Sequence, residues 1–401
     1  MSATILAAPA YWSSWADILP VLQAHLPELT HQILEQLNTH SQAPPAFQAA
    51  ADAARTIAAT GWEPPTWAAI ASSQTQAPTP PPAPAEGPFA RGWQHKASTT
   101  AHARLKAELF NAIPPASQAL VTSQSGPFAS RAFTTIPYTN DFAYPSHLFR
   151  ILLLRRLRLP LPLFARTCRC RRTFDSLGDH RAACAQSGAL RSRGGPLERA
   201  AARVCREAGA RVTTHTRLAD LNVQHVQHID DRRIDVIANG LALWGGAQLA
   251  VDATLVSPLT RAGEPRRRAG RFAGAALTDA RKAKERAYPE LLHNSRCRLV
   301  VLGIEVGGRW SEEAASFITS LARTKTRDIP APLRHAAATS LISRWTAFLT
   351  HAAMTAFAAS LLFEDPTHHH NLDGEPPSLS DLLAQLPPDP THPSRLPPHP
   401  P

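Results

Sequence analysis

Four residues with sulfur or imidazole donor atoms lie close together in the segment TCRCRRTFDSLGDHRAAC. They follow the spacing C-x-C-x9-H-x3-C and are Cys168, Cys170, His180 and Cys184. Such groups are the usual ligands of a tetrahedral zinc ion, and five cysteines in the whole chain do not suggest a disulfide framework. Gly178 lets the chain turn back between the two halves of the set. The segment 166–188 therefore predicts a zinc site, with reduced cysteines in an arginine-rich loop as the alternative.

Two aspartates lie in runs that otherwise have the pattern of buried strands. Asp235 is in RRIDVIA, and Asp252 is in QLAVDATLVSP. A carboxylate inside a buried strand is unfavourable unless it is paired or binds a metal ion. Two strands that follow each other along the chain can bring both carboxylates to one edge of a sheet, where hard oxygen ligands suit Mg²⁺ or Mn²⁺. We expect a magnesium or manganese site there, with a network of ion pairs at the strand ends as the alternative.

A lysine on the next predicted helix could complete this acidic pair. In ARKAKERAYPEL, Lys284 and Tyr288 are four residues apart and share a helix face. A lysine near two carboxylates could stabilise charge that develops on a phosphate. Glu198, on the preceding helix, is a weaker fourth candidate. Asp235, Asp252 and Lys284 are the predicted catalytic set.

The overall charge favours a polyanionic partner. The chain of 401 residues has 42 basic and 31 acidic residues, which gives a formal net charge of +11. We expect the partner to be DNA, with RNA as an alternative and no membrane involved. A solvated basic surface is the other interpretation of the arginine runs. The arginines predicted to contact nucleic acid are Arg155, Arg156, Arg158, Arg169, Arg171, Arg172, Arg266, Arg267 and Arg268.

Composition and periodicity divide the chain into several parts. The predicted parts are a helical N-terminal region (1–72), a proline-rich linker (73–90), a helical or irregular basic region (91–165), the cysteine and histidine segment (166–188), a globular domain (189–327), C-terminal helices (328–364) and a disordered proline-rich tail (365–401). The N-terminal prediction depends on apolar residues at helical spacing, namely Ile18, Leu22, Leu26, Leu29, Ile33 and Leu37. The uncharged run 345–363 is interpreted as a buried helix rather than a membrane span.

The globular domain has helices interleaved with short β-branched runs, so its predicted fold class is α/β. The expected elements are a helix (196–208), three strands (211–218, 232–238, 248–256), a helix (270–288), a strand (298–306) and a helix (311–324). Both aspartates lie on strands of this pattern, and Lys284 lies on its second helix.

This order of parts resembles the C-terminal region of non-LTR retrotransposon polyproteins. The quoted segments are most similar to reverse-transcriptase-like proteins of the dinoflagellate type, over a little under half of the chain. The segments that carry the resemblance are LFRILLLRRLRLPLP, TCRCRRTFDSLGDHRAACAQSG, GGPLERAAARVCREAGARV, GAQLAVDATLVSPL, YPELL and IEVGGRW. The resemblance implies a CCHC zinc knuckle at Cys168, Cys170, His180 and Cys184, followed by a small restriction-endonuclease-like mixed sheet flanked by helices.

In that family the PD-(D/E)xK nuclease cleaves DNA with a divalent metal ion. Asp235 and Asp252 match its two acidic positions, and Lys284 matches a lysine displaced onto the following helix. The sequence departs from the motif in having Ile234 before Asp235 and Thr254 in the lysine position, and it contains no YxDD polymerase motif. The expected function is a metal-dependent DNA endonuclease module of retroelement origin, in the nucleus or otherwise the cytoplasm. A catalytically inactive nucleic-acid-binding remnant of the same region is the alternative.

Overall fold

The structure is a computed structural model that describes residues 3–38, 43–77, 92–164, 166–221, 223, 226–363, 378 and 380. Most of the predicted proline-rich linker and nearly all of the predicted tail lie outside these residues. The chain divides into two compact units, Met1–Ile113 and Pro114–Pro401. The candidate site residues all belong to the second unit.

The first unit is helical, as predicted. Its helices are α1 (Ala3–His25), α2 (Pro27–Asn38), α3 (Pro45–Ala58), α4 (Trp67–Ala71) and α5 (Trp93–Ala112). A cluster of indole rings forms the centre of its core. Trp12 is fully buried, and its ring lies 5.5 Å from that of Trp62 and 5.6 Å from that of Trp93, both edge to face.

Two details of this unit differ from the sequence prediction. Ile18, Leu26 and Leu29 are 47%, 51% and 44% exposed, because α1 ends at His25 and α2 begins at Pro27, so the apolar series does not follow one helix face. The unit also extends to Ile113 instead of ending at residue 72. The reason is that Trp93 and Ala97 of α5 pack into the same core as Trp12.

The second unit begins with short helices and turns that lead to the sheet. These elements are α6 (Pro115–Ser123), α7 (Arg131–Thr134), η1 (Asn140–Phe142), α8 (Ser146–Arg156), α9 (Asp179–Ala183), η2 (Ala185–Ser187) and α10 (Ala189–Ser192). The following elements contain the predicted acidic site. They are α11 (Gly194–Glu207), β1 (Arg211–Arg217), η3 (Leu218–Asp220), β2 (Arg233–Asn239), η4 (Trp244–Gly246), β3 (Gln248–Val256), α12 (Ala275–Ala287), η5 (Pro289–Leu291), β4 (Cys297–Glu305), α13 (Glu312–Lys325) and α14 (Ala331–Leu362).

The predicted α/β fold class is confirmed. The four strands form one mixed sheet in the order β1-β2-β3-β4, in which β1, β2 and β3 are antiparallel and β3 and β4 are parallel. The parallel pair needs a crossover connection, and α12 supplies it. Strand β3 has the bounds that the sequence predicted, and the other elements of the α/β pattern begin within five residues of their predicted starts.

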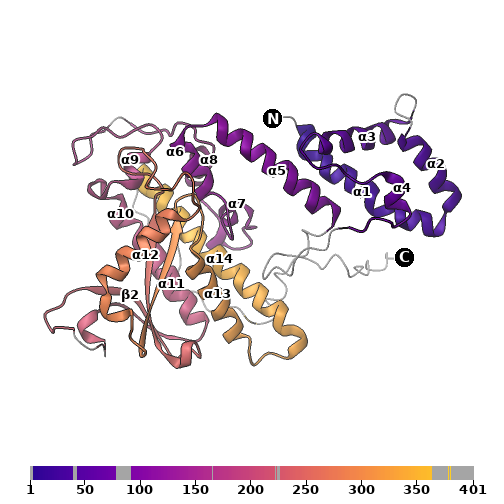
Figure 1. The fold of residues 1–401 in the computed structure, drawn as a ribbon. Coiled ribbons are helices and arrows are strands. Elements are labelled where there is room, and N and C mark those ends of the chain that lie inside the picture. Colours follow the sequence, from indigo (N-terminus) through magenta and orange to yellow (C-terminus); the bar gives the residue numbers. More distant parts are fainter. Residues whose placement is uncertain are drawn as a thin grey trace, which may run out of the picture. The chain divides into compact units, whose positions relative to one another are not determined.

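Helices cover both faces of the sheet (Figure 1). Residues alternate between the faces along each strand. Val251 and Leu302 pack with α11, α13 and α14, whereas Ala250 and Val301 pack on the other face with Tyr288, which follows α12. Strand β4 is buried along nearly its whole length, as expected for a strand with apolar neighbours on both faces.

The longest helix, α14, passes through the core of the second unit (Figure 1). It is the one helix among the described residues that is long and apolar enough to cross a membrane, and 94% of its most apolar window is buried within the protein. Two of its polar residues are paired inside the unit, since the Trp345 indole donates to Glu207 of α11 at 2.7 Å and Arg344 donates to the same carboxylate. These contacts are those of a core helix, in agreement with the sequence interpretation.

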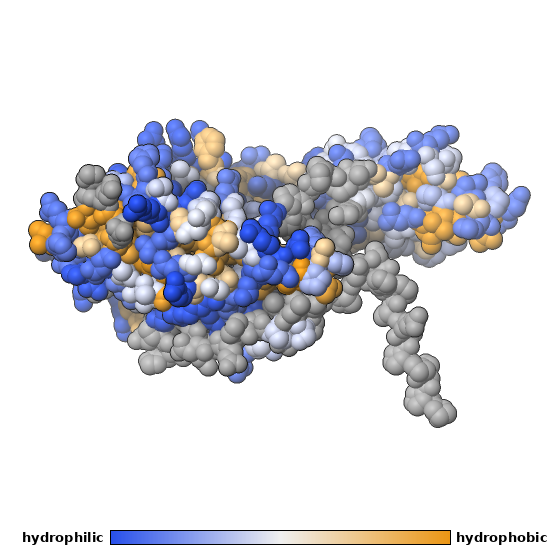
Figure 2. Space-filling model, turned by 90° about the horizontal axis from the view of Figure 1, so that it is seen from below, coloured by the Kyte–Doolittle hydropathy of each residue, from blue (hydrophilic) through white to orange (hydrophobic). Residues whose placement is uncertain are grey.

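The surface drawn in Figure 2 carries mainly hydrophilic residues, with hydrophobic ones interspersed among them. Among the described residues the most exposed large apolar side chains are Phe164, Ile229 and Ile136. Isolated apolar side chains of this kind are common on protein surfaces and define no site.

Candidate functional site

The four predicted soft ligands lie together in a hairpin and the short helix that follows it. Thr167 pairs with Thr173 across the hairpin, and the amide of Cys168 donates to the carbonyl of Arg172 at 2.8 Å. Cys168 and Cys170 are therefore held in one tight turn. Gly178 has φ of 76° directly before α9, so the chain turns back there, as its position in the sequence predicted.

The donor atoms of this cluster are spaced as a metal site requires. The cluster comprises Cys168, Cys170, His180 and Cys184, whose ligand atoms all lie within 4.8 Å of one another. The sulfur atoms of Cys168 and Cys184 are 3.9 Å apart, and Cys170 Sγ is 3.3 Å from His180 Nε2. Two sulfur atoms on a tetrahedral zinc ion would be about 3.8 Å apart. The cluster could hold a metal ion, and its donors are consistent with zinc.

The second nitrogen of the histidine ring is also fixed. His180 Nδ1 lies 2.7 Å from the carbonyl oxygen of Arg261, an arrangement that leaves Nε2 to face the three thiols. The backbone is held as well, because the carboxylate of Asp175 accepts the amides of Leu177, Asp179 and His180 at 2.7–3.0 Å. The backbone amide of Arg172 lowers the pKa of the Cys170 thiol, which favours the thiolate form that binds metal.

The helix that carries His180 is anchored by a buried ion-pair group. Asp179 is 5% exposed and accepts bonds from Arg155 at 2.5 Å and from both terminal nitrogens of Arg158 at 2.8 and 2.5 Å. Burial alone would raise the pKa of Asp179, but the hydrogen bonds and charges of these two arginines outweigh burial and lower it. The group ties α8 to α9 and supports the metal cluster.

The second predicted site, the Asp235 and Asp252 pair, is formed by the strand register. Val236 pairs with Val251 in the antiparallel β2–β3 ladder, and continuing the register by one residue places Asp235 opposite Asp252. Side chains of directly opposed residues lie on one face of a sheet. In the β1–β2 ladder, Thr214 pairs with Val236 and Thr216 with Ile234, whereas His215 between them has a left-handed φ of 52° that interrupts the regular strand. Asp235 and Asp252 together form the acidic row.

Asp252 is completely buried, and its two oxygens have different surroundings. Oδ1 lies 2.8 Å from Lys284 Nζ of α12 and accepts the Thr254 hydroxyl at 3.1 Å. Oδ2 has no hydrogen-bond partner among the described residues. The nearby Tyr288 hydroxyl donates instead to the carbonyl of Arg233 at 2.8 Å. The predicted lysine thus contacts the predicted aspartate, and a buried carboxylate oxygen is left without a donor.

The other carboxyl groups near Asp252 have raised pKa values. Burial, together with the charges of Asp252 and Glu198, raises the pKa of Asp235 to about 7, although the Ala253 amide donates to Asp235 Oδ2 at 2.8 Å. Burial also raises the pKa of Glu198, and the charge of Asp252 adds to this effect. Three carboxyl groups therefore repel one another in a site with one lysine, and a divalent cation would relieve this repulsion. This charge excess and the unpartnered oxygen fit a hard metal ion.

His215 was not predicted as a site residue, and no pattern in the sequence indicated it. Its φ of 52° is in the left-handed region, which is rare for a residue with a side chain inside a strand. Its Nε2 lies 3.9 Å from Glu198 Oε2. The backbone conformation thus directs an imidazole toward the acidic group.

The predicted nucleic-acid-binding arginines fall into two sets. The prediction is wrong for Arg155, which is 7% exposed and donates to Asp179 and to the carbonyl of Leu177. Arg158 is engaged by the same aspartate, and the guanidinium of Arg156 lies 4.8 Å from the centre of the Phe133 ring. These arginines stabilise the fold because buried acids and aromatic rings face them. The other set is exposed or half-buried and comprises Arg169, Arg171, Arg172, Arg266, Arg267 and Arg268.

Two further cysteines are buried outside the metal cluster, as predicted. Cys205 of α11 and Cys297 of β4 are 0% and 2% exposed, and burial raises the pKa of both thiols. No family of known proteins matches this sequence, and no curated protein matches it.

Proposed function

We propose that residues 189–327 form a metal-dependent, restriction-like DNA endonuclease module of retroelement origin, preceded by a zinc knuckle at 166–188. The proposal joins the family resemblance of the sequence to the geometry of the acidic row. It also accounts for the departure at Thr254, since the lysine that the motif places there would be supplied from α12 by Lys284. A DNA substrate would place the protein in the nucleus.

The observation that carries the proposal is the environment of Asp252. A fully buried carboxylate with one unpartnered oxygen is unfavourable by about 1–3 kcal/mol or more unless something binds it. Asp235 lies opposite Asp252 on the same face and adds a second carboxylate, so the pair offers oxygen ligands of the kind that Mg²⁺ or Mn²⁺ takes. A structural ion pair with Lys284 alone would need only one of these carboxylates.

Asp235, Asp252 and Lys284 have separate roles in this proposal. Asp235 and Asp252 would hold the metal ion, which when bound supplies charge stabilisation at the scissile phosphate and activates water. Lys284 holds Asp252 at 2.8 Å and is 32% exposed at its side chain, so it can also face a phosphate. Its positive charge would stabilise the negative charge that develops during cleavage.

A second candidate function is a nucleic-acid-binding remnant without catalysis. The observation in its favour is the direct Lys284–Asp252 ion pair, which already neutralises part of the acidic site. In this alternative the row stabilises the sheet, and the exposed arginines alone contact nucleic acid.

The test is nicking of supercoiled plasmid at low salt with Mg²⁺ or Mn²⁺ by the full chain. We expect Asp252→Asn to lower nicking by at least about 100-fold, because it removes a metal ligand at nearly constant volume. The matched control is Asp328→Asn, which makes the same change at an exposed position. Equal nicking by Asp252→Asn and wild type would exclude this site. If neither nicks and both bind DNA with equal affinity, the remnant takes the place of the endonuclease.

A further inference from the structure

A pocket with two arginines in its lining lies beside the cysteine and histidine cluster, and Asp235, Asp252 and Lys284 are not among its lining residues. Its volume is about 350 Å³. One wall is the loop that follows β3, and the other is the chain from α9 to η2. The lining residues are Ala183, Cys184, Ala185, Gln186, Thr260, Arg261 and Arg266.

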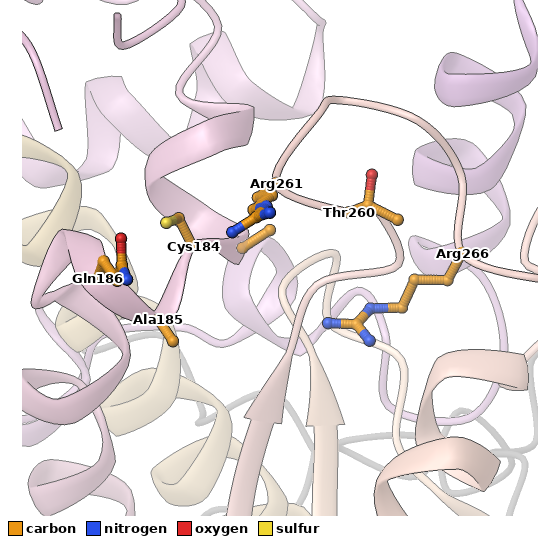
Figure 3. A pocket seen from close by; sticks show the side chains of 7 residues that line it. Cys184, Ala185, Gln186, Thr260, Arg261 and Arg266 are labelled. Atoms are coloured by element: carbon orange, nitrogen blue, oxygen red, sulfur yellow. The ribbon is translucent and has the colours of Figure 1, made fainter. Parts of the chain in front are cut away.

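The polar groups of this pocket are mainly hydrogen-bond donors. Figure 3 shows Arg261 extending toward Cys184 and Arg266 extending into the same space from the other end of the loop. Thr260 contributes a hydroxyl and Gln186 an amide. Among the described residues no carboxylate lines the pocket, so its chemistry suits an anion with several acceptor oxygens.

The guanidinium of Arg266 is fixed in place and still available to a ligand. Its Nε donates to the carbonyl of Ser257 at 2.9 Å. Neither terminal nitrogen of Arg266 makes a hydrogen bond or ion pair with the described residues, and those two nitrogens form the fork that matches a phosphate. A pre-positioned fork loses less entropy on binding than a free arginine side chain.

A third arginine, Arg193, lies near Arg266 and has no acidic partner among the described residues. Arg193 is 2% exposed and donates to the carbonyls of Ala182 and Leu255, both at 2.9 Å. Within the described residues no carboxylate pairs with it. Burial and the positive charge of Arg266 both lower the pKa of Arg193, so the two cations are close enough to repel each other. A buried cation without a counter-charge is unfavourable, and an anion in the pocket would offset it.

We propose that this pocket binds a backbone phosphate of DNA through Arg261 and Arg266. The inference rests on the proposed function only for the choice of DNA as the polyanion. The pocket also adjoins the metal cluster. Cys184 belongs to the cluster and lines the pocket, and the carbonyl of Arg261, another lining residue, is the partner of His180 Nδ1. The metal cluster would thus position the phosphate-binding loop rather than contact bases.

The experiment is fluorescence anisotropy of a labelled DNA duplex with the zinc-loaded full chain, at several salt concentrations and without Mg²⁺. We expect Arg261→Gln and Arg266→Gln each to weaken binding by about tenfold. Each should also lower the slope of log affinity against log salt by about 1, because one phosphate contact is lost. The matched control is Arg206→Gln, which removes one exposed charge at the far end of α11.

Three outcomes bear on the inference. Weaker DNA binding by the two pocket variants, with Arg206→Gln unchanged, supports the inference. This result does not depend on plasmid nicking, so the inference can hold even if the nuclease proposal fails. Equal, small losses in Arg261→Gln and Arg206→Gln would overturn it, since the effect would then be one of net charge. Binding of inorganic phosphate that Arg266→Gln abolishes, with DNA binding unchanged, would also overturn it in favour of a free anion. Arg266 also holds the loop through its bond to Ser257, so its substitution could disturb the loop itself. Arg261 is exposed, and Arg261→Gln is therefore the decisive variant.

Discussion

The metal cluster and the acidic row are two candidate cation sites built in opposite ways. The cluster takes all its ligands from a hairpin and the short helix after it, and its donor atoms lie within 4.8 Å of one another. The row consists of Asp235 on β2 and Asp252 on β3, and Lys284 reaches Asp252 from α12. The cluster is therefore formed locally, whereas the row exists only when the sheet has its register.

The two sites also differ in how their charges are balanced. Next to the cluster, Asp179 is buried but fully paired with two arginines. In the row, Asp252 is buried with one oxygen unpartnered, and Asp235 has its pKa raised to about 7. On the proposed function, the cluster would stabilise the fold when it binds metal, while the row would keep unfavourable charge for an exchangeable metal ion.

The largest expected effect is on the cluster. Cys184→Ser should reduce bound zinc from one ion per chain to almost none, because one of four ligands is lost. The second unit should also lose about 5 kcal/mol or more of stability, since the binding free energy of a structural zinc ion contributes to folding. Zinc content by elemental analysis and urea unfolding would measure both. The control is Cys205→Ala, a buried cysteine outside the cluster, which should keep its zinc. Full zinc content in Cys184→Ser would contradict the assignment.

A smaller loss is expected from the ion-pair group beside the cluster. Asp179→Asn leaves Arg155 buried without its counter-charge, so we expect the free energy of unfolding to fall by about 3–5 kcal/mol. Urea denaturation measures this, and Asp220→Asn, which breaks an exposed Arg217 pair, should change it by less than about 1 kcal/mol. Similar small effects for both variants would mean that the buried group does not support the cluster.

Sequence reasoning predicted the cluster well because its information is local. The spacing of Cys168, Cys170, His180 and Cys184 already brings the donors within reach of one ion, and Gly178 marks the turn. The acidic pair was predictable because two aspartates lie in otherwise apolar runs. Lys284 was predictable because it lies on the helix that follows the strand of Asp252. His215 and Arg193 were missed, because a left-handed residue inside a strand and a buried arginine without an acid have no sequence pattern.

The arginine run shows where composition misleads. Arg155 and Arg169 look alike in the sequence, yet Arg155 faces a buried aspartate 24 residues further along the chain and Arg169 faces solvent. A count of basic residues cannot separate the two, because the acidic partner is far from the run in sequence. Similarly, Leu26 continued the periodic pattern of the first unit, but the helix break at that position removed it from the core.

A buried carboxylate outside both sites shows which properties of the row are due to burial alone. Glu305 on β4 is 2% exposed, and burial raises its pKa to about 7 in spite of the charge of Arg309. The folded state therefore binds the proton more tightly than the unfolded state. This contribution to stability is fully present below the ordinary glutamate pKa and is lost as the pH rises through about 7.

Glu305→Gln should remove this pH dependence. We expect the variant to exceed wild type by up to about 3 kcal/mol at pH 8.5 and to approach it at pH 4.5 and below. Urea denaturation at the two pH values gives the difference, with Asp328→Asn as the exposed control. A constant difference between the proteins would show that the pKa of Glu305 is the same in the folded and unfolded states. The variant should nick plasmid as wild type does, because Glu305 is not part of the row.

The smallest expected effect is the stabilisation of the folded state by Mg²⁺. It tests most directly whether the row is a metal site or a structural ion-pair group. At a free Mg²⁺ concentration ten times its Kd, binding stabilises the folded state by about 1.4 kcal/mol, which is a rise in Tm of about 3–6 °C for a unit of this size. We expect this rise in wild type and in Glu305→Gln but not in Asp252→Asn. Thermal unfolding of the zinc-loaded proteins, with and without Mg²⁺, measures it. If Asp252→Asn shows the same rise as wild type, the ion binds elsewhere, and the row is a structural ion-pair group like that of Asp179. If the rise is lost, Asp252 is distinguished from Glu305, an equally buried acid, by its unpartnered oxygen and by Asp235 opposite it.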